Sequence, residues 1–134
     1  MLSPSLDSIR IFLHVLAAGV WVGGQIVLAG VVPGLRKVGP EATKAAANGF
    51  ARVAWPAFVL AFATGVWNLI SADDTVGTSY QVTLGIKILL VVVAGASAAA
   101  HASSEKKVVM AATGAIGLIA SLVVMFMGAQ LGTA

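Results

Sequence analysis

The sequence predicts an all-α integral membrane protein that folds as a four-helix bundle. Of its 134 residues 59% are hydrophobic and only 10% are charged, and the mean hydropathy is +0.99. A soluble domain needs about a quarter of its residues charged to cover its surface with polar groups. The apolar residues also gather in four stretches, each long enough to cross a bilayer core, which takes about 20 residues of helix.

The predicted transmembrane helices share one domain of residues 1–134, because the length fits a single domain. Each span is expected to be helical, since lipid cannot hydrogen-bond unpaired backbone groups. The connections are a first loop with a surface helix starting at Pro40-Glu41, a polar second loop and a tight third turn. The spans cover about residues 11–32, 53–70, 84–102 and 108–131.

The basic residues predict how the chain is oriented. Six lie in the first and third connections, whereas the N-terminal segment has Arg10 alone. By the positive-inside rule, these two connections face the cytoplasm, and both termini lie on the non-cytoplasmic side with Asp73, Asp74 and Tyr80. We therefore expect a multi-pass protein of the inner (plasma) membrane, and no nucleic-acid partner despite the net charge of +3. The six residues are Arg36, Lys37, Lys44, Arg52, Lys106 and Lys107.

Small residues mark faces where helices can approach one another. Gly19 and Gly23 form a small-xxx-small pair in the first span, Gly128 and Gly132 form another near the end of the fourth, and residues 95–100 are all Gly, Ala or Ser. Such residues favour close helix packing. Packing inside the bundle is the favoured interpretation, with a homodimer or a larger membrane complex as alternatives.

Three ionisable residues lie at membrane depth, where each needs a physical explanation. His14 shares a helical face with Trp21 and Gln25, so this stripe is expected to face the protein interior. Imidazole binds haem iron, copper and zinc; the alternative is a hydrogen bond to a neighbour. Lys87 either extends to the outer headgroups or pairs with an anionic group or moves a proton. His101, at the cytoplasmic end of the third span, is interpreted as an interfacial histidine.

The expected depth in the membrane distinguishes these three ionisable residues. His101 lies about 20 Å below Lys87 along the third helix, so His14 and His101 are not expected to bind one metal within a subunit. His14 and Lys87 fall in the same outer half of the membrane. The sequence predicts a pocket there, formed by His14, Trp21, Asn68, Lys87 and a methionine of the fourth span.

Several segments together resemble CopD-like copper-resistance membrane domains and the related HemJ-type protoporphyrinogen oxidases. They are Leu13-His14 with residues 20–24 and 32–36 in the first helix, Trp55-Pro56 with residues 64–67 in the second, and residues 84–91 in the third. In HemJ-type proteins a first-helix histidine and a third-helix lysine are the functional pair, and a b-type haem is bound. The matching positions are His14 and Lys87. A further histidine of that family lies nearer the lysine than His101 does.

Three functions follow as hypotheses. The favoured one is a haem-b-binding redox protein, with His14 as axial ligand and Lys87 on a propionate or substrate carboxylate; as an enzyme it would be a haem-dependent membrane oxidoreductase of protoporphyrinogen-oxidase type. The second is a copper-binding or copper-transfer protein that uses His14 with Met125 or Met127. These two lie two residues apart on a helix, so only one can contact an ion, and packing or lipid contact is the favoured interpretation of both. The third is a non-catalytic subunit of a larger membrane complex. The Ala/Gly/Val-rich composition is typical of a high-GC bacterium.

Overall fold

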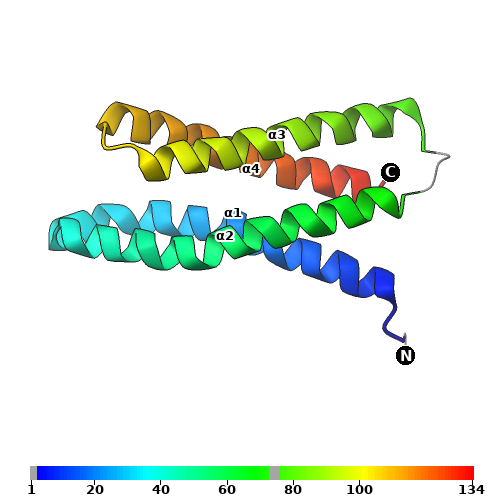
Figure 1. The fold of residues 1–134 in the computed structure, drawn as a ribbon, viewed down its shortest axis with the longest axis horizontal. Coiled ribbons are helices and arrows are strands. Elements are labelled where there is room, and N and C mark those ends of the chain that lie inside the picture. Colours follow the sequence, from blue (N-terminus) through cyan, green and yellow to red (C-terminus); the bar gives the residue numbers. More distant parts are fainter. Residues whose placement is uncertain (1–2, 73–75) are drawn as a thin grey trace. The chain divides into compact units, whose positions relative to one another are not determined.

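The computed structural model describes residues 3–72 and 76–134 and contains four long α-helices (Figure 1). Each is long and apolar enough to cross a membrane. The all-α class and the four apolar helices predicted from the sequence are therefore confirmed. Asp73 and Asp74, which the charge pattern placed outside, lie beyond the described residues. The helices are α1 (Leu6–Val38), α2 (Pro40–Ile70), α3 (Thr78–Ser103) and α4 (Lys107–Gly132).

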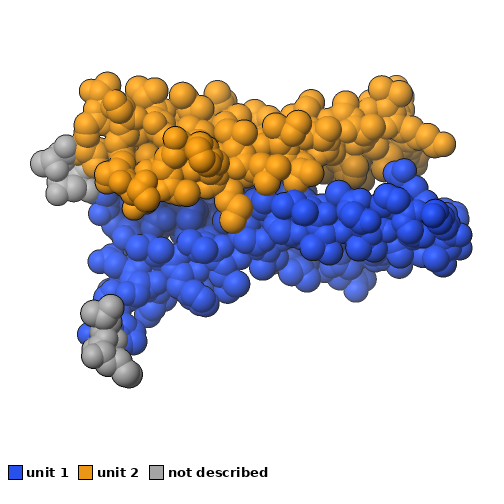
Figure 2. Space-filling view, turned by 180° about the vertical axis from the view of Figure 1, so that it is seen from behind, with its two compact units in different colours: residues 1–72 blue, residues 73–134 orange. Residues whose placement is uncertain are grey.

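The chain divides into two compact units, residues 1–72 and residues 73–134, which Figure 2 colours separately. Unit 1 is the antiparallel pair of α1 and α2, and unit 2 is the antiparallel pair of α3 and α4. Each unit is thus a helical hairpin with its own interhelical seam. The single four-helix domain remains a prediction.

The turn of unit 1 is one residue long. α1 begins after Ser5, whose hydroxyl accepts a hydrogen bond of 3.1 Å from the backbone N–H of Ser8, a typical N-cap. It ends at Val38 because Gly39 has a φ of 146°, a conformation open to glycine and strained for other residues. Pro40 then occupies the first turn of α2, where its missing N–H costs no helical hydrogen bond.

The structure differs here from the predicted first loop and its separate surface helix. Residues 34–52 belong to the two long helices, apart from Gly39, although α2 does begin at the predicted Pro40. The charged residues end the apolar pattern, but the alanine-rich segment after Pro40 has high helix propensity and continues the helix. At 33 and 31 residues, α1 and α2 measure about 50 Å and 46 Å, more than the roughly 30 Å of a bilayer core.

Aromatic rings fix the register between α1 and α2. The ring of Trp21 packs against both Trp55 and Phe58 of α2, with centroid distances of 5.6 and 4.6 Å. One turn along, Phe50 packs over Gly24 so closely that an added Cβ would clash with its ring. These contacts determine which residues of α1 and α2 face each other.

In unit 2, small residues bring α3 and α4 together, as the sequence predicted. A Cβ added to Gly117 would lie 3.4 Å from Cβ of Ser97 and 3.8 Å from the carbonyl oxygen of Ala94. The pair Gly19 and Gly23 in α1 behaves differently, since a Cβ at either position would meet no described atom within 4 Å. Within unit 1, that motif does not bring α1 against α2.

Candidate functional site

The predicted polar stripe of α1 faces α2. His14 is half-buried, and its Nδ1 lies 3.0 Å from Oγ1 of Thr64, which is only 4% exposed. Gly65 leaves room for the ring, because a Cβ there would lie 3.3 Å from Cε1 of His14. The histidine is therefore seated in the α1–α2 seam of unit 1.

The hydrogen bonds of Thr64 favour one tautomer of His14. The hydroxyl lies 2.7 Å from the carbonyl oxygen of Leu60 and 3.2 Å from that of Ala61, so its single proton is donated to the backbone. Oγ1 then accepts a hydrogen bond from Nδ1–H of His14. In the neutral ring the lone pair lies on Nε2, and metal-binding histidines are commonly oriented by such a bond through their other nitrogen.

Trp21 and Gln25 continue the polar stripe along α1 from His14 toward the Gly39 turn. Trp21 is 7% exposed and packs among the aromatic rings of α2, and Nε2 of Gln25 donates a hydrogen bond of 3.1 Å to the carbonyl oxygen of Trp21. Within unit 1 this face of α1 packs against α2, and its position in the interior of a four-helix bundle stays a prediction. The aromatic rings separate the polar pair of His14 and Thr64 from the Gly39 end of the hairpin.

Arg10, which the charge pattern assigned only to the N-terminal segment, is a polar neighbour of this pair. It lies one turn before His14 on the same face of α1, and its side chain is 12% exposed. Its Nη2 lies 3.1 Å from Oδ1 of Asp7, and Nη1 donates a 3.5 Å hydrogen bond to the carbonyl oxygen of Trp67, in the last turn of α2, where a cation is favourable. Its Nε is buried with no hydrogen-bond partner among the described residues. The predicted Asn68 is half-buried, one residue after Trp67.

Lys87 lies in the seam of unit 2. It is half-buried, and its Nζ lies 3.2 Å from the point where a Cβ on Gly128 would sit. The ammonium therefore lies over α4, where the missing side chain of Gly128 makes room. Of the two methionines considered as ligands, Met127 is 9% exposed and Met125 is 45% exposed.

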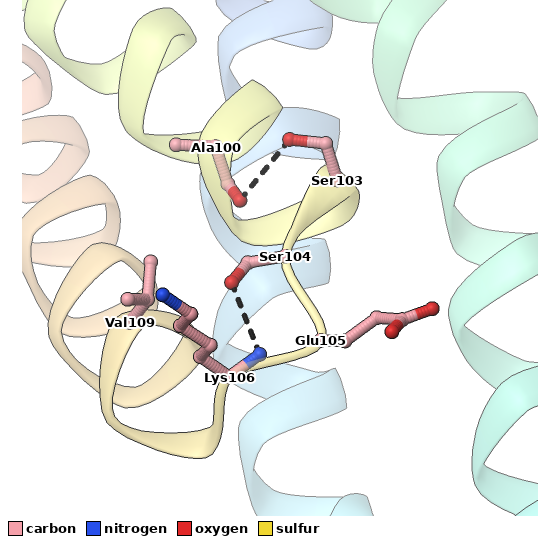
Figure 3. Close-up of a pocket in the computed structure, with 6 residues that line it drawn as sticks. All are labelled: Ala100, Ser103, Ser104, Glu105, Lys106 and Val109. Atoms are coloured by element: carbon pink, nitrogen blue, oxygen red, sulfur yellow. Dashed lines mark hydrogen bonds between the residues drawn. The ribbon is translucent and has the colours of Figure 1, made fainter.

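His101 makes a structural contact at the other end of unit 2. Its Nδ1 donates a hydrogen bond of 2.7 Å to the carbonyl oxygen of Met110, and its ring packs against Gly114. This joins the end of α3 to the first turn of α4, in line with the interfacial interpretation. Beside it, the α3–α4 turn forms an open hollow in which the N–H of Lys106 donates to Oγ of Ser104 at 3.2 Å (Figure 3).

The structure thus brings part of the predicted site together. His14, Trp21 and Asn68 belong to the α1–α2 pair, and Thr64 and Arg10 join them, whereas Lys87 and Met125 belong to the α3–α4 pair. Among the residues that the structure describes, no three His, Asp or Glu side chains are grouped so that they could hold a metal ion. A metal bound at His14 would need ligands of another type, such as methionine sulfur.

More than half of the chain matches a known protein family. The family described as copper resistance protein D matches residues 44–134, which cover most of α2 and all of α3 and α4. The matched segment includes Thr64 and Lys87 and begins after His14. Searches of curated proteins and of solved structures give no match. Because the match covers more than half of the chain, this four-helix membrane protein belongs to the copper resistance protein D family.

Proposed function

We propose that this protein handles copper in the membrane and that His14 is a Cu(I) ligand. The hydrogen bond between His14 and Thr64 carries the proposal, together with the family's link to copper resistance. Imidazole and thioether groups are suitable ligands for Cu(I), which makes few demands on coordination number. The buried Thr64 hydroxyl would hold the ring with Nε2 as the ligand atom.

The surroundings of His14 support a role beyond helix packing. A histidine serving only to join two helices can bond directly to a backbone carbonyl, as His101 does to Met110. His14 instead bonds to a hydroxyl that is itself fixed by the backbone of α2, an arrangement that orients the imidazole as metal sites require. The aromatic cluster around Trp21 would limit water on one side.

The other hypotheses remain predictions and are tested on the same sample. Nε2 of His14 would suit haem iron as well as copper, and Lys87 would then be the partner for a propionate. Nothing in the described geometry favours iron over copper. A non-catalytic role in a larger complex predicts neither ligand.

The test is Cu(I) binding by the purified protein in detergent under reducing conditions, in competition with a chromogenic Cu(I) chelator. We expect stoichiometric binding that is lost in His14→Ala and retained in His101→Ala, a matched control because His101 is engaged with the backbone of α4. Absence of Cu(I) uptake by the wild-type protein, or equal uptake by the His14→Ala variant, would contradict the proposal. An absorption spectrum after haem supplementation, with a Soret band lost in His14→Ala, would support haem instead.

The sulfur ligand is examined separately. Met125→Leu and Met127→Leu preserve size and apolar character while removing the thioether. The variant that weakens Cu(I) binding identifies the methionine concerned. Unchanged binding in both variants would leave His14 as a ligand and remove the fourth-helix sulfur from the proposal.

A further inference from the structure

α2 carries a row of three exposed polar side chains along one side. Lys44, Asn48 and Arg52 are spaced four residues apart, so they follow one another along one side of the helix, and all three are exposed. Phe50, which packs against Gly24 of α1, lies on the opposite side of α2, whereas Trp55 follows the row on the same side, three residues after Arg52. The row is therefore accessible in unit 1.

The register of the hairpin gives the depth of this row. Phe50 packs against Gly24 and Trp55 against Trp21, so Arg52 lies level with the α1 residues between them. That level is near the middle of the apolar run predicted at residues 11–32. About 14 Å of apolar α1 extends beyond Arg52 toward the Gly39 turn.

The two helices of unit 1 therefore place the membrane boundary at different heights. Beyond the level of Arg52, α1 still exposes the apolar side chains of Ile26, Val27 and Val31, at 50%, 65% and 47%. At the same height α2 exposes cations. A guanidinium at this depth is unfavourable unless an anion pairs with it or the headgroup region is drawn inward.

The same face of α2 becomes apolar past Arg52. Val59, Val66 and Ile70 continue it at helical spacing and are 63%, 41% and 77% exposed. A cationic row followed by an apolar row is the pattern that a phospholipid complements, with its phosphate at the cations and its acyl chains along the apolar surface.

We propose that the α2 face of Lys44, Asn48 and Arg52 binds the phosphate of an anionic phospholipid. The two cations flank the Asn48 amide, which adds hydrogen-bond donors between them. Charge complementarity selects an anionic over a zwitterionic lipid: residues 33–52 carry Arg36, Lys37, Lys44 and Arg52 against a single acidic residue, Glu41. With this lipid bound, the headgroup region lies at Arg52 on α2, while acyl chains still cover the apolar surface of α1 toward the Gly39 turn. This proposal is independent of the copper site.

The test uses the full chain in neutral detergent, titrated with dioleoylphosphatidylglycerol or with dioleoylphosphatidylcholine. Native mass spectrometry counts the bound lipids and thermal unfolding reports their stabilisation. We expect a saturable phosphatidylglycerol adduct whose dissociation constant rises about fivefold in Lys44→Gln or Arg52→Gln and about thirtyfold in the double variant, since each cation near an anionic lipid contributes a comparable increment. Arg52→Lys retains most of the affinity.

Two controls separate this face from general charge attraction. Lys106→Gln/Lys107→Gln removes two cations from the turn of unit 2 and is expected to leave the adduct unchanged; inorganic phosphate at the same concentration is expected to give no stabilisation. Equal binding of the two lipids, or equal losses in the two double variants, would overturn the proposal. Stabilisation by inorganic phosphate alone would overturn it as well, because it would indicate a simple anion site. Helicity and thermal unfolding without added lipid verify that each variant folds.

Discussion

Replacing Gly24 by alanine tests the register on which the His14 site depends. A Cβ at this position would meet the ring of Phe50, with Cδ2 at 3.1 Å and Cζ at 3.4 Å. An aromatic ring packed against a helix backbone cannot yield as a flexible side chain does, so the ring must swing out or the helices must separate. Overpacking of this kind costs about 1–3 kcal/mol. Alanine's better helix propensity offsets up to about 1 kcal/mol of this cost.

The neighbouring glycine supplies the matched control. A Cβ on Gly23 meets nothing within 4 Å, so Gly23→Ala gains the same helix propensity without the clash. The difference in unfolding free energy between the two variants should therefore equal the packing cost alone, about 1–3 kcal/mol. Reversible unfolding in mixed SDS micelles, followed by circular dichroism, measures it. Equal stability of Gly23→Ala and Gly24→Ala would refute the register, and a Phe50→Leu background should remove most of the difference.

Three other substitutions test separate contacts. Gly39→Ala forces a φ of 146° on a residue with a side chain and should lower the unfolding free energy by about 1–3 kcal/mol; an unchanged value would exclude the one-residue turn. Thr64→Val removes the acceptor of His14 at constant shape and should weaken Cu(I) binding about tenfold or more, and wild-type affinity would show that the hydroxyl does not orient the ring. His101→Ala removes the hydrogen bond to Met110 and should cost about 1 kcal/mol in unfolding while Cu(I) binding stays the same; loss of copper instead would give His101 a ligand role.

The helices could be predicted from the sequence because their cause is local. An apolar run of sufficient length must be helical in lipid whatever surrounds it, and the Pro40 start signal depends only on neighbouring residues. The error at residues 34–52 has a physical reason. Hydropathy records where lipid contact ends, whereas the helix ends where backbone geometry changes, at Gly39.

The site was predictable only in part, because it depends on which residues of two helices face each other. The spacing of His14, Trp21 and Gln25 predicted which face of α1 is polar, but not which residues of α2 pack against it. Thr64 was missed since one threonine in an apolar run gives no hydropathy signal, and its importance arises from the register with α1. Arg10 could have been found from its four-residue offset to His14, which places both on one face.

Register also changes what the positive charges mean. If Lys44 and Arg52 belong to one loop, both lie at the same depth and both serve only to orient the chain. On a continuous helix they lie eight residues apart, about 12 Å along the axis, and the aromatic contacts of Phe50 and Trp55 place Arg52 level with apolar α1. Arg52, which ends the apolar segment of α2, thus lies beside a part of α1 that is still apolar. The lipid proposal accounts for this difference, because an anionic phosphate at Arg52 lets the headgroup layer adapt around α2 while α1 stays covered.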